Sequence, residues 1–375
     1  MIYLDNSATT KVCEKAAKKA FDMMTVQFGN PSSLHGAGDD AAKEISFARQ
    51  AIAKALHCKA DEIVFTSGGS ESNNTAIFGA SSLLGKRGNR IVTTDCEHPS
   101  VAEPIKVLEQ RGFEIIRLST KDGKIDSKEL VEAINSKTIL VSMMLVNNET
   151  GAVFPVREAA MAIKRAKAPA LLHCDAVQAF MKLDIMPQIM GIDLLSVSAH
   201  KVHAPKGIGA LYIRNGVHLP PLIYGGGQES GMRSGTENAA SIAAFACAVE
   251  HQLPNMKTNS QIRQKLYAHL EKLITEKLPF AKINKPANAV DCIMSLTLDG
   301  YNAETVVHYL AQKDICISAG SACKKGARSY VLEAFGLDEG KSRETVRISL
   351  CADNTEQELE ALVNELSDMK IQRNK

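Results

Sequence analysis

The chain has 375 residues, of which 45% are hydrophobic, enough for one large and one small domain with a well-buried core. Its formal net charge is +2 with both signs interspersed, so it has neither a basic stripe for nucleic acid nor an acidic tail. No apolar run approaches the roughly 20 residues of a membrane helix, and the first six residues do not resemble a secretory leader. We therefore expect a cytoplasmic protein that binds neither membranes nor, directly, nucleic acid.

Nine cysteines are scattered along the chain, and none forms a Cys-x-x-Cys pair. Neither a disulfide framework nor a closed zinc site is therefore indicated. We expect most of them to be small buried side chains, so a catalytic role for any one of them needs separate evidence.

Between about residues 60 and 215, short apolar runs alternate with segments of helical spacing. The strand-like runs are 62–66, 90–93, 113–116, 138–142, 170–173, 194–197 and 209–213. Several are separated by helical segments such as 101–111, 127–135 and 156–167. This alternation predicts an α/β fold with a mostly parallel sheet covered on both faces. Ligands of such sheets bind at the carboxyl ends of the strands.

The C-terminal third has a different pattern. Its predicted elements are a long polar helix at about 257–277, a strand at 292–298, a helix near 303–312 and a Gly/Ser turn at 318–321. Thr355 and Glu358 then form a capping-box pattern before a final amphipathic helix. We predict a large domain over residues 14–255 and a smaller α+β domain that combines residues 1–13 with 256–375.

Two predicted strands end in residues suited to a phosphorylated ligand. After the first strand, Gly69 and Ser70 lie in a turn of small residues, where backbone N–H groups and a helix dipole favour phosphate. A plain tight turn is the alternative. Asp175 lies where a buried strand emerges, and a carboxylate there needs a cation such as the protonated ring nitrogen of a cofactor. Its alternative role is to cap the next helix.

A third strand ends in Ser198, Ala199, His200 and Lys201. Desolvation at a strand end lowers the pKa of a lysine and makes it a usable Schiff-base amine. Ser198 and His200 beside it are suited to phosphate contacts. A lone lysine in a loop is ordinarily a surface residue, so the assignment depends on the acid and the phosphate turn that precede it.

The turn at Gly69 and Ser70, the acid Asp175 and Lys201 follow one another in this order along the chain. Further motifs lie before, between and after them. These motifs lie at 3–10, 30–35, 66–74, 97–101, 147–151, 175–178, 198–201, 225–229, 233–236 and 318–323. From about residue 3 to 365 the chain thereby resembles the cysteine desulfurases of the class V aminotransferase fold, in the group that resembles NifS and IscS. The resemblance implies the pyridoxal-phosphate-dependent transferase fold, similar to that of aspartate aminotransferase, with pyridoxal 5′-phosphate as cofactor.

The resemblance also implies the role of each matching residue. The catalytic residues are Lys201, which holds the cofactor, His98, which stacks on its ring and moves protons, and Cys323, which receives sulfur. The cofactor-binding residues are Gly69, Ser70, His98, Asn148, Asp175, Gln178, Ser198, His200, Lys201 and Thr236. Thr236 is expected to reach the site from the second subunit of a homodimer. Asn148 and Arg347 are expected to hold the carboxylate of the substrate, L-cysteine.

Cys323 follows a stretch of small residues, which predicts a mobile loop that exposes its thiol. The resemblance implies that the cofactor labilises the C–S bond of L-cysteine toward this thiolate, so that the products are L-alanine and a persulfide on Cys323. The implied partner is a sulfur-acceptor protein such as an iron–sulfur scaffold or a tRNA-thiolation enzyme. Cys323 is also a candidate ligand of an iron–sulfur cluster, and no other metal site is expected.

The chain departs from the family pattern at several positions. Ala319 replaces the usual second Ser of the Cys323 motif, and Ala204 stands where Gly is common. The basic run 324–328 replaces small polar residues, and it either lowers the thiol pKa, docks an acidic acceptor or is a solvated charge cluster. Cys351 and Asp353 lie where Gly-Arg often follows the substrate-arginine motif.

Three other classes of protein are alternatives to a desulfurase. A selenocysteine lyase or another enzyme of the class V aminotransferase fold shares most of the motifs, although an aminotransferase needs no thiol in a Gly/Ser loop. A non-catalytic scaffold or sulfur-relay partner would not need Lys201, Asp175, His98 and Cys323 together. A metal-binding module built on Cys and His is disfavoured, because the Cys and His residues of this sequence lack the spacing of such ligands.

Overall fold

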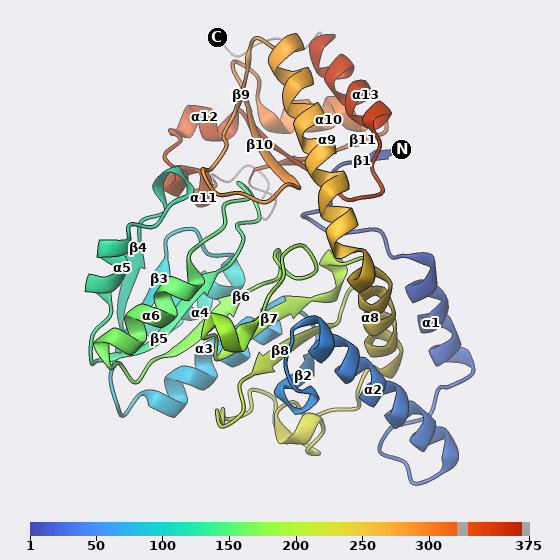
Figure 1. Ribbon diagram of the computed structural model, residues 1–375, viewed down its shortest axis with the longest axis vertical. Helices are drawn as coiled ribbons and strands as arrows, with labels where there is room; N and C mark the ends of the chain where they lie inside the picture. Colours follow the sequence, from blue (N-terminus) through green and yellow to red (C-terminus); the bar gives the residue numbers. More distant parts are fainter. Residues whose placement is uncertain (321–328, 370–375) are drawn as a thin grey trace.

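The computed structural model describes residues 1–320 and 329–369. Cys323 and the basic run 324–328 therefore lie outside the described residues. In Figure 1 a large sheet with helices on both sides forms the lower part of the molecule, and a smaller sheet with its own helices forms the upper part. Within the described ranges no helix is long and apolar enough to cross a bilayer.

The lower part is built on seven described strands in the order β2-β8-β7-β6-β5-β3-β4. Their bounds are β2 (Ile63–Thr66), β3 (Arg90–Thr94), β4 (Glu114–Leu118), β5 (Thr138–Met144), β6 (Leu171–Asp175), β7 (Leu194–Ser198) and β8 (Gly209–Ile213). Neighbours from β7 to β4 pair in parallel, whereas β8 is antiparallel to both β7 and β2. The predicted α/β fold with a mostly parallel sheet is confirmed.

Helices cover both faces of this sheet (Figure 1). They are α1 (Glu14–Thr25), α2 (Gly36–Ala55), α3 (Gly69–Leu84), α4 (Pro99–Gln110), α5 (Ser127–Ala133), α6 (Val156–Ala166), α7 (Pro187–Met190) and α8 (Ala239–Gln252). Leu140 of β5 belongs to the apolar cluster that contains Ile77 of α3 and Ile105 of α4. The next residue, Val141, belongs to the cluster that contains Ile52 of α2. Successive strand residues point to opposite faces, so the two clusters lie on the two sides of the sheet.

The upper part contains an antiparallel sheet in the order β12-β13-β10-β9. Its elements are α9 (Met256–Lys277), β9 (Ala281–Ile283), β10 (Ile293–Leu298), α10 (Ala303–Ala311), β12 (Ser318–Ala319), α11 (Tyr330–Phe335), α12 (Glu339–Arg343), β13 (Thr345–Ser349) and α13 (Glu356–Ser367). β1 (Ile2–Tyr3) joins this part by pairing with β11 (Ile315–Cys316). A separate apolar cluster combines Leu4 with residues of 266–369. This separation supports the predicted domain division at residues 13 and 255, which stays a prediction.

Of two local features predicted in the C-terminal third, a capping box and a Gly/Ser turn, the first is confirmed and the second was wrong in part. The predicted capping box is confirmed, because the hydroxyl of Thr355 accepts from Glu358 N and the Glu358 carboxylate accepts from Thr355 N. The predicted Gly/Ser turn at 318–321 was wrong at its start, where Ser318 and Ala319 form β12 and pair with Arg347 and Val346 of β13. That pairing is made with a strand distant in sequence, so no local pattern encodes it.

Candidate active site

A cavity of about 320 Å³ lies at the carboxyl ends of β6 and β7. The predicted site residues that line it are Gly69, Ser70, His98, Asn148, Asp175, Gln178, Ser198, His200, Lys201 and Arg347. This is the edge of the sheet at which ligands of open α/β folds bind. Residues that follow or end five strands of the large sheet are thus brought together with Arg347 of β13.

Two predicted site residues do not line this cavity. Thr236 is exposed and lines a different cavity, together with Ser67 and Arg233. A residue that completes the site of a second subunit is expected to lie away from the site of its own chain. Cys323 lies outside the described residues.

The turn before α3 is compact because it contains glycines. A Cβ on Gly69 would lie 2.7 Å from Cγ2 of Val177, and Gly68 has φ of 152°. Gly209 of β8 packs closely against the same turn, since a Cβ on Gly209 would lie 2.7 Å from Cα of Gly68. The first turn of α3 therefore presents its N–H groups at the cavity, where the helix dipole favours a phosphate.

The side chain of His200 adds a polar contact on the same side of the cavity. Its Nδ1 lies 3.2 Å from the hydroxyl of Thr9. Burial lowers the pKa of His200 to about 4, and the charge of Lys201 acts in the same direction. His200 is therefore neutral at physiological pH and can contact a phosphate by hydrogen bonding rather than by charge.

Asp175 is buried and held by two donors. Nδ2 of Asn73 donates to Oδ2 at 2.8 Å, and N of Val177 donates to Oδ1 at 3.0 Å. A buried carboxylate without a cationic partner is costly. Asp175 lines the cavity, so a protonated ring nitrogen placed there would supply the missing charge.

His98 is linked to Asp175 through a short chain of hydrogen bonds. Asn73 also donates to Oγ of Ser100 at 2.8 Å, and that hydroxyl lies 2.8 Å from Nδ1 of His98. The backbone N of Ser100 donates to the same Nδ1 at 3.2 Å, so Nδ1 is an acceptor and Nε2 carries the proton. Burial lowers the pKa of His98, which keeps the ring neutral.

Lys201 presents its amine to two backbone carbonyls of the N-terminal segment. Nζ donates to the carbonyl oxygen of Ser7 at 2.5 Å and to that of Ala8 at 2.8 Å. Burial lowers the pKa of Lys201 to about 7, and the charges of Arg347 and Lys182 act in the same direction. An amine with such a pKa is partly unprotonated at neutral pH, which is the form that reacts with a carbonyl carbon.

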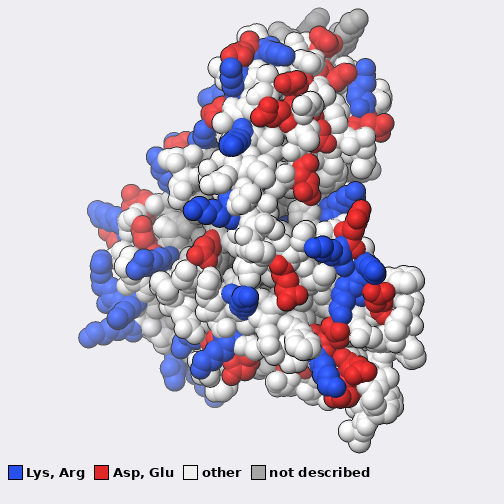
Figure 2. Space-filling model, turned by 45° about the vertical axis from the view of Figure 1, so that its right-hand side comes forward, with Lys and Arg blue, Asp and Glu red and all other residues white. Residues whose placement is uncertain are grey.

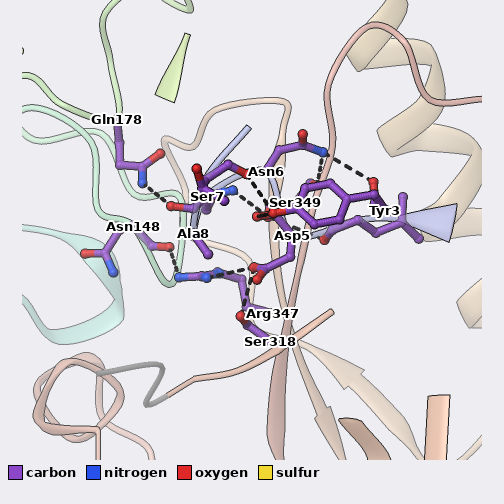
Figure 3. A network of polar contacts seen from close by, with 12 residues as sticks. Tyr3, Asp5, Asn6, Ser7, Ala8, Asn148, Gln178, Ser318, Arg347 and Ser349 are labelled. Atoms are coloured by element: carbon purple, nitrogen blue, oxygen red, sulfur yellow. Dashed lines mark hydrogen bonds and ion pairs between the residues drawn. The ribbon is translucent and has the colours of Figure 1, made fainter. Parts of the chain in front are cut away.

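Arg347 lies on β13 and connects the upper and lower parts of the molecule (Figure 3). It donates from Nη1 to the carbonyl oxygen of Asn148 at 2.9 Å and from Nη2 to Oδ1 of Asp5 at 3.0 Å. Ser318 of β12 donates to the same carboxylate oxygen at 2.8 Å. Within residues 1–320 and 329–369, Nε of Arg347 is buried without a partner. This unused donor beside the cavity suits a substrate carboxylate.

The chemistry of these groups fits pyridoxal phosphate. A helix N-terminus with nearby hydroxyls suits its phosphate, the buried Asp175 suits its ring nitrogen, and Lys201 suits its aldehyde carbon. Gln178 also faces the cavity, with Nε2 donating to the carbonyl oxygen of Ser7 at 2.8 Å. The fold and the site together define an enzyme of the pyridoxal-phosphate-dependent class.

Comparisons with known proteins place the chain within that class. The family model described as Aminotransferase class-V matches residues 2–362. The "Cysteine desulfurase IscS" of Clostridium botulinum is 38% identical, over 99% of this chain and 95% of the relative. The chain belongs to the class-V aminotransferase family.

Solved structures agree with this assignment. A structure titled "NIFS-LIKE PROTEIN" superimposes with a TM-score of 0.92 at 33% identity and covers 98% of each chain. A structure titled "SspA in complex with cysteine" has a TM-score of 0.83 at 36% identity and covers 95% of this chain and 100% of the other.

Several residues of the site had no assigned role in the sequence analysis. Asn73 and Ser100 orient Asp175 and His98, and Asp5 pairs with Arg347. Asn73 lies four positions after Gly69 on α3, so helical spacing could have placed it on the same face. The pairing of Asp5 joins residues 342 positions apart, for which a single sequence contains no signal.

Proposed function

We propose that the protein is a cysteine desulfurase that converts L-cysteine to L-alanine and retains the sulfur as a persulfide on Cys323. The observation that carries the proposal is the arrangement of Lys201, Arg347 and Asp175 on one cavity, with Asp175 at the end of the strand that neighbours β7. Membership of a family whose matching members are named cysteine desulfurases supports the same reaction. A selenocysteine lyase is not favoured, because no relative reported above carries that name.

The residues of the cavity divide into those that hold the cofactor and those that hold the substrate. Gly69, Ser70, Ser198 and His200 line the side of the cavity where a phosphate fits. The guanidinium of Arg347 and the side chain of Asn148 would hold the substrate carboxylate, since a planar guanidinium matches a carboxylate in geometry. Pyridoxal phosphate, when bound, withdraws electrons from the α-carbon of the substrate and so weakens its C–S bond.

Sulfur transfer then requires a thiolate and a proton carrier. The thiolate of Cys323 forms an S–S bond with the substrate sulfur as the C–S bond breaks, and the carbon takes up the electron pair and a proton. The amine of Lys201 is the group in the cavity suited to move protons to and from carbon, because its pKa is about 7. His98, with its proton on Nε2, is the second candidate. The net products are L-alanine and a persulfide on Cys323.

A homodimer is part of the proposal. Thr236 is exposed and lines a different cavity from the one around Lys201, as expected of a residue that serves the site of a partner. Exposed apolar side chains gather where α1 leads to α2, namely Phe21, Met24, Val26, Phe28 and Leu34. Figure 2 shows that the lower tip of the molecule has few charged side chains, which suits burial against a second subunit.

The destination of the sulfur is a protein acceptor in this proposal. Figure 2 shows positive and negative side chains intermingled over most of the face drawn, with Lys and Arg more frequent along its lower left edge. An iron–sulfur scaffold and a tRNA-thiolation enzyme are the two acceptor types expected from the resemblance. The cytoplasmic location and the role of Cys323 as a cluster ligand stay predictions.

The test is turnover of L-cysteine by the purified protein. We expect a yellow protein that releases equal amounts of alanine and sulfide in the presence of a mild reductant. Lys201→Ala should be colourless after dialysis and inactive, and L-selenocysteine should not replace L-cysteine as the better substrate. A colourless Lys201→Ala protein that still produces alanine would overturn the assignment of the cavity.

A further inference from the structure

A second group of reactive side chains lies beside the cofactor cavity. His203 follows Lys201 by two positions, and Cys351 and Asp353 occupy the turn after β13, the strand that carries Arg347. One ring nitrogen of His203, the sulfur of Cys351 and one carboxylate oxygen of Asp353 all lie within 4.8 Å of one another. The three residues also line a cavity of about 160 Å³ that extends to Lys201.

We propose that His203, Cys351 and Asp353 bind a zinc ion. Imidazole, thiolate and carboxylate are the three ligand types that zinc takes in proteins, with bonds of about 2.0–2.3 Å. Ligand atoms around a tetrahedral ion are then about 3.5 Å apart, so the present spacing closes by small side-chain rotations. Asp353 is exposed and can rotate without disturbing the core. The fourth position opens on the cavity, which has room for a water ligand.

A backbone carbonyl near His203 fixes which of its ring nitrogens can bind a metal ion. Its Nδ1 lies 3.1 Å from the carbonyl oxygen of Lys11. A carbonyl can only accept, so Nδ1 carries the proton and Nε2 keeps a lone pair for a metal ion. A histidine ligand typically donates its other ring N–H to such a carbonyl, which fixes the orientation of the ring.

Cys351 lies in a turn that is fixed at both ends. Its backbone N donates to Oδ1 of Asn354 at 2.9 Å, and Nδ2 of Asn354 donates to the carbonyl oxygen of Tyr3 at 3.1 Å. The backbone N of Asn354 donates to the carbonyl oxygen of Cys351 at 3.3 Å. Burial raises the pKa of Cys351 to about 11. Zinc must therefore displace a proton from this thiol.

Lys182, Lys201 and Arg263 line the same cavity, and their positive charges oppose a cation. Arg263 is paired with Asp291, whose Oδ1 lies 3.0 Å from Nε. The carboxylate of Asp353 supplies a negative charge close to His203 and Cys351.

The experiment measures zinc affinity of the holoenzyme by competition with a chromogenic chelator. All proteins carry Cys323→Ser, so that the thiol assigned to catalysis cannot capture the metal. We expect one zinc per chain in this background. Cys351→Ala and Asp353→Asn should each weaken binding at least tenfold, whereas Cys58→Ala, a change at a half-buried cysteine elsewhere, should leave it unchanged. Cobalt added in place of zinc should give a thiolate charge-transfer band that Cys351→Ala abolishes.

Two outcomes would overturn the proposal. One is that Cys351→Ala and Asp353→Asn bind zinc as tightly as their parent. The other is that the cobalt band survives in Cys351→Ala. The absorbance of bound pyridoxal phosphate serves as the folding control, and Asp353→Asn decides the question if Cys351→Ala fails to fold, because it keeps the shape of the side chain.

Discussion

At the scale of single residues, the orientation of Asp175 depends on Asn73. The amide donates to a buried carboxylate, and such charge-assisted hydrogen bonds contribute about 1.5–3 kcal/mol. Asn73→Ala should therefore weaken pyridoxal phosphate binding roughly 10- to 100-fold, measured by the dissociation constant of the cofactor. Asn74→Ala is the matched control, because within the described residues its side chain donates to the backbone carbonyls of Ser70 and Ser100 and not to Asp175, and it should leave the affinity within about twofold. Equal effects of the two variants would contradict this role of Asn73.

Glu97 makes the stability of the fold depend on pH. Its Oε1 accepts from Met144 N and from the Thr94 hydroxyl, and within the described residues its buried Oε2 has no partner. Burial raises its pKa from 4.5 to about 8. The native state thus keeps a proton that the unfolded chain releases, so the stabilisation is complete below pH 4.5 and is lost as pH rises through about 8.

Glu97→Gln removes this titration while keeping the oxygen that accepts both hydrogen bonds. Between pH 5 and pH 8.5 the free energy of unfolding should fall by at least about 2 kcal/mol more in the wild type than in Glu97→Gln. Denaturant unfolding of the holoenzyme at the two pH values measures the difference. The same pH slope in both proteins would show that Glu97 is ionised in the native state.

The residues that contact the cofactor cavity could be predicted from the sequence, and those that orient them could not. Lys201, Asp175 and the turn at Gly69 each follow an apolar strand, so their place at one sheet edge follows from the strand pattern. The two backbone carbonyls that hold the Lys201 amine come from residues 7 and 8. Residue identity does not show which backbone carbonyls will be contacted, and these two contacts join residues 193 and 194 positions apart.

At the scale of elements, the conformation of the turn before α3 depends on the close packing of β8 against it. A Cβ at Gly209 would lie 2.6 Å from the carbonyl oxygen of Val197 and 2.7 Å from Cα of Gly68. Because these neighbours are backbone atoms, Gly209→Ala should cost about 1–3 kcal/mol of stability and weaken cofactor binding. Gly36→Ala, where nothing lies within 4 Å, is the control and should be close to neutral. Thermal unfolding and cofactor titration of the two variants test this; a neutral Gly209→Ala would contradict it.

The elements with a local pattern were predicted well, and those defined by distant partners were not. The seven strand-like runs correspond to β2 through β8, because buried strands are continuous apolar segments. The antiparallel direction of β8 and the existence of β12 depend on pairing with β7 and β13. Strand direction and such short pairings are set by tertiary contacts, which apolar runs alone do not encode.

At the scale of the whole molecule, the proposed homodimer makes each cavity depend on two chains. In a heterodimer of Lys201→Ala with Thr236→Asp, one cavity has its own lysine and an intact Thr236 from the partner. Such a heterodimer, isolated with two different affinity tags, should recover roughly half of the wild-type activity, because one of its two sites is complete. Each homodimer should be nearly inactive. An isolated heterodimer without activity, or a monomer with full cofactor affinity, would rule out the shared site.

The central claim is that the cavity around Lys201 delivers the sulfur of L-cysteine to Cys323. The most direct measurement is mass spectrometry of the peptide that contains Cys323 after one turnover with L-cysteine, with thiols and persulfides trapped by alkylation. We predict a gain of one sulfur atom on Cys323 in the wild type, and no gain on any cysteine in Lys201→Ala or Cys323→Ser. A sulfur atom found on another cysteine, or alanine formation that continues unchanged in Cys323→Ser, would contradict it.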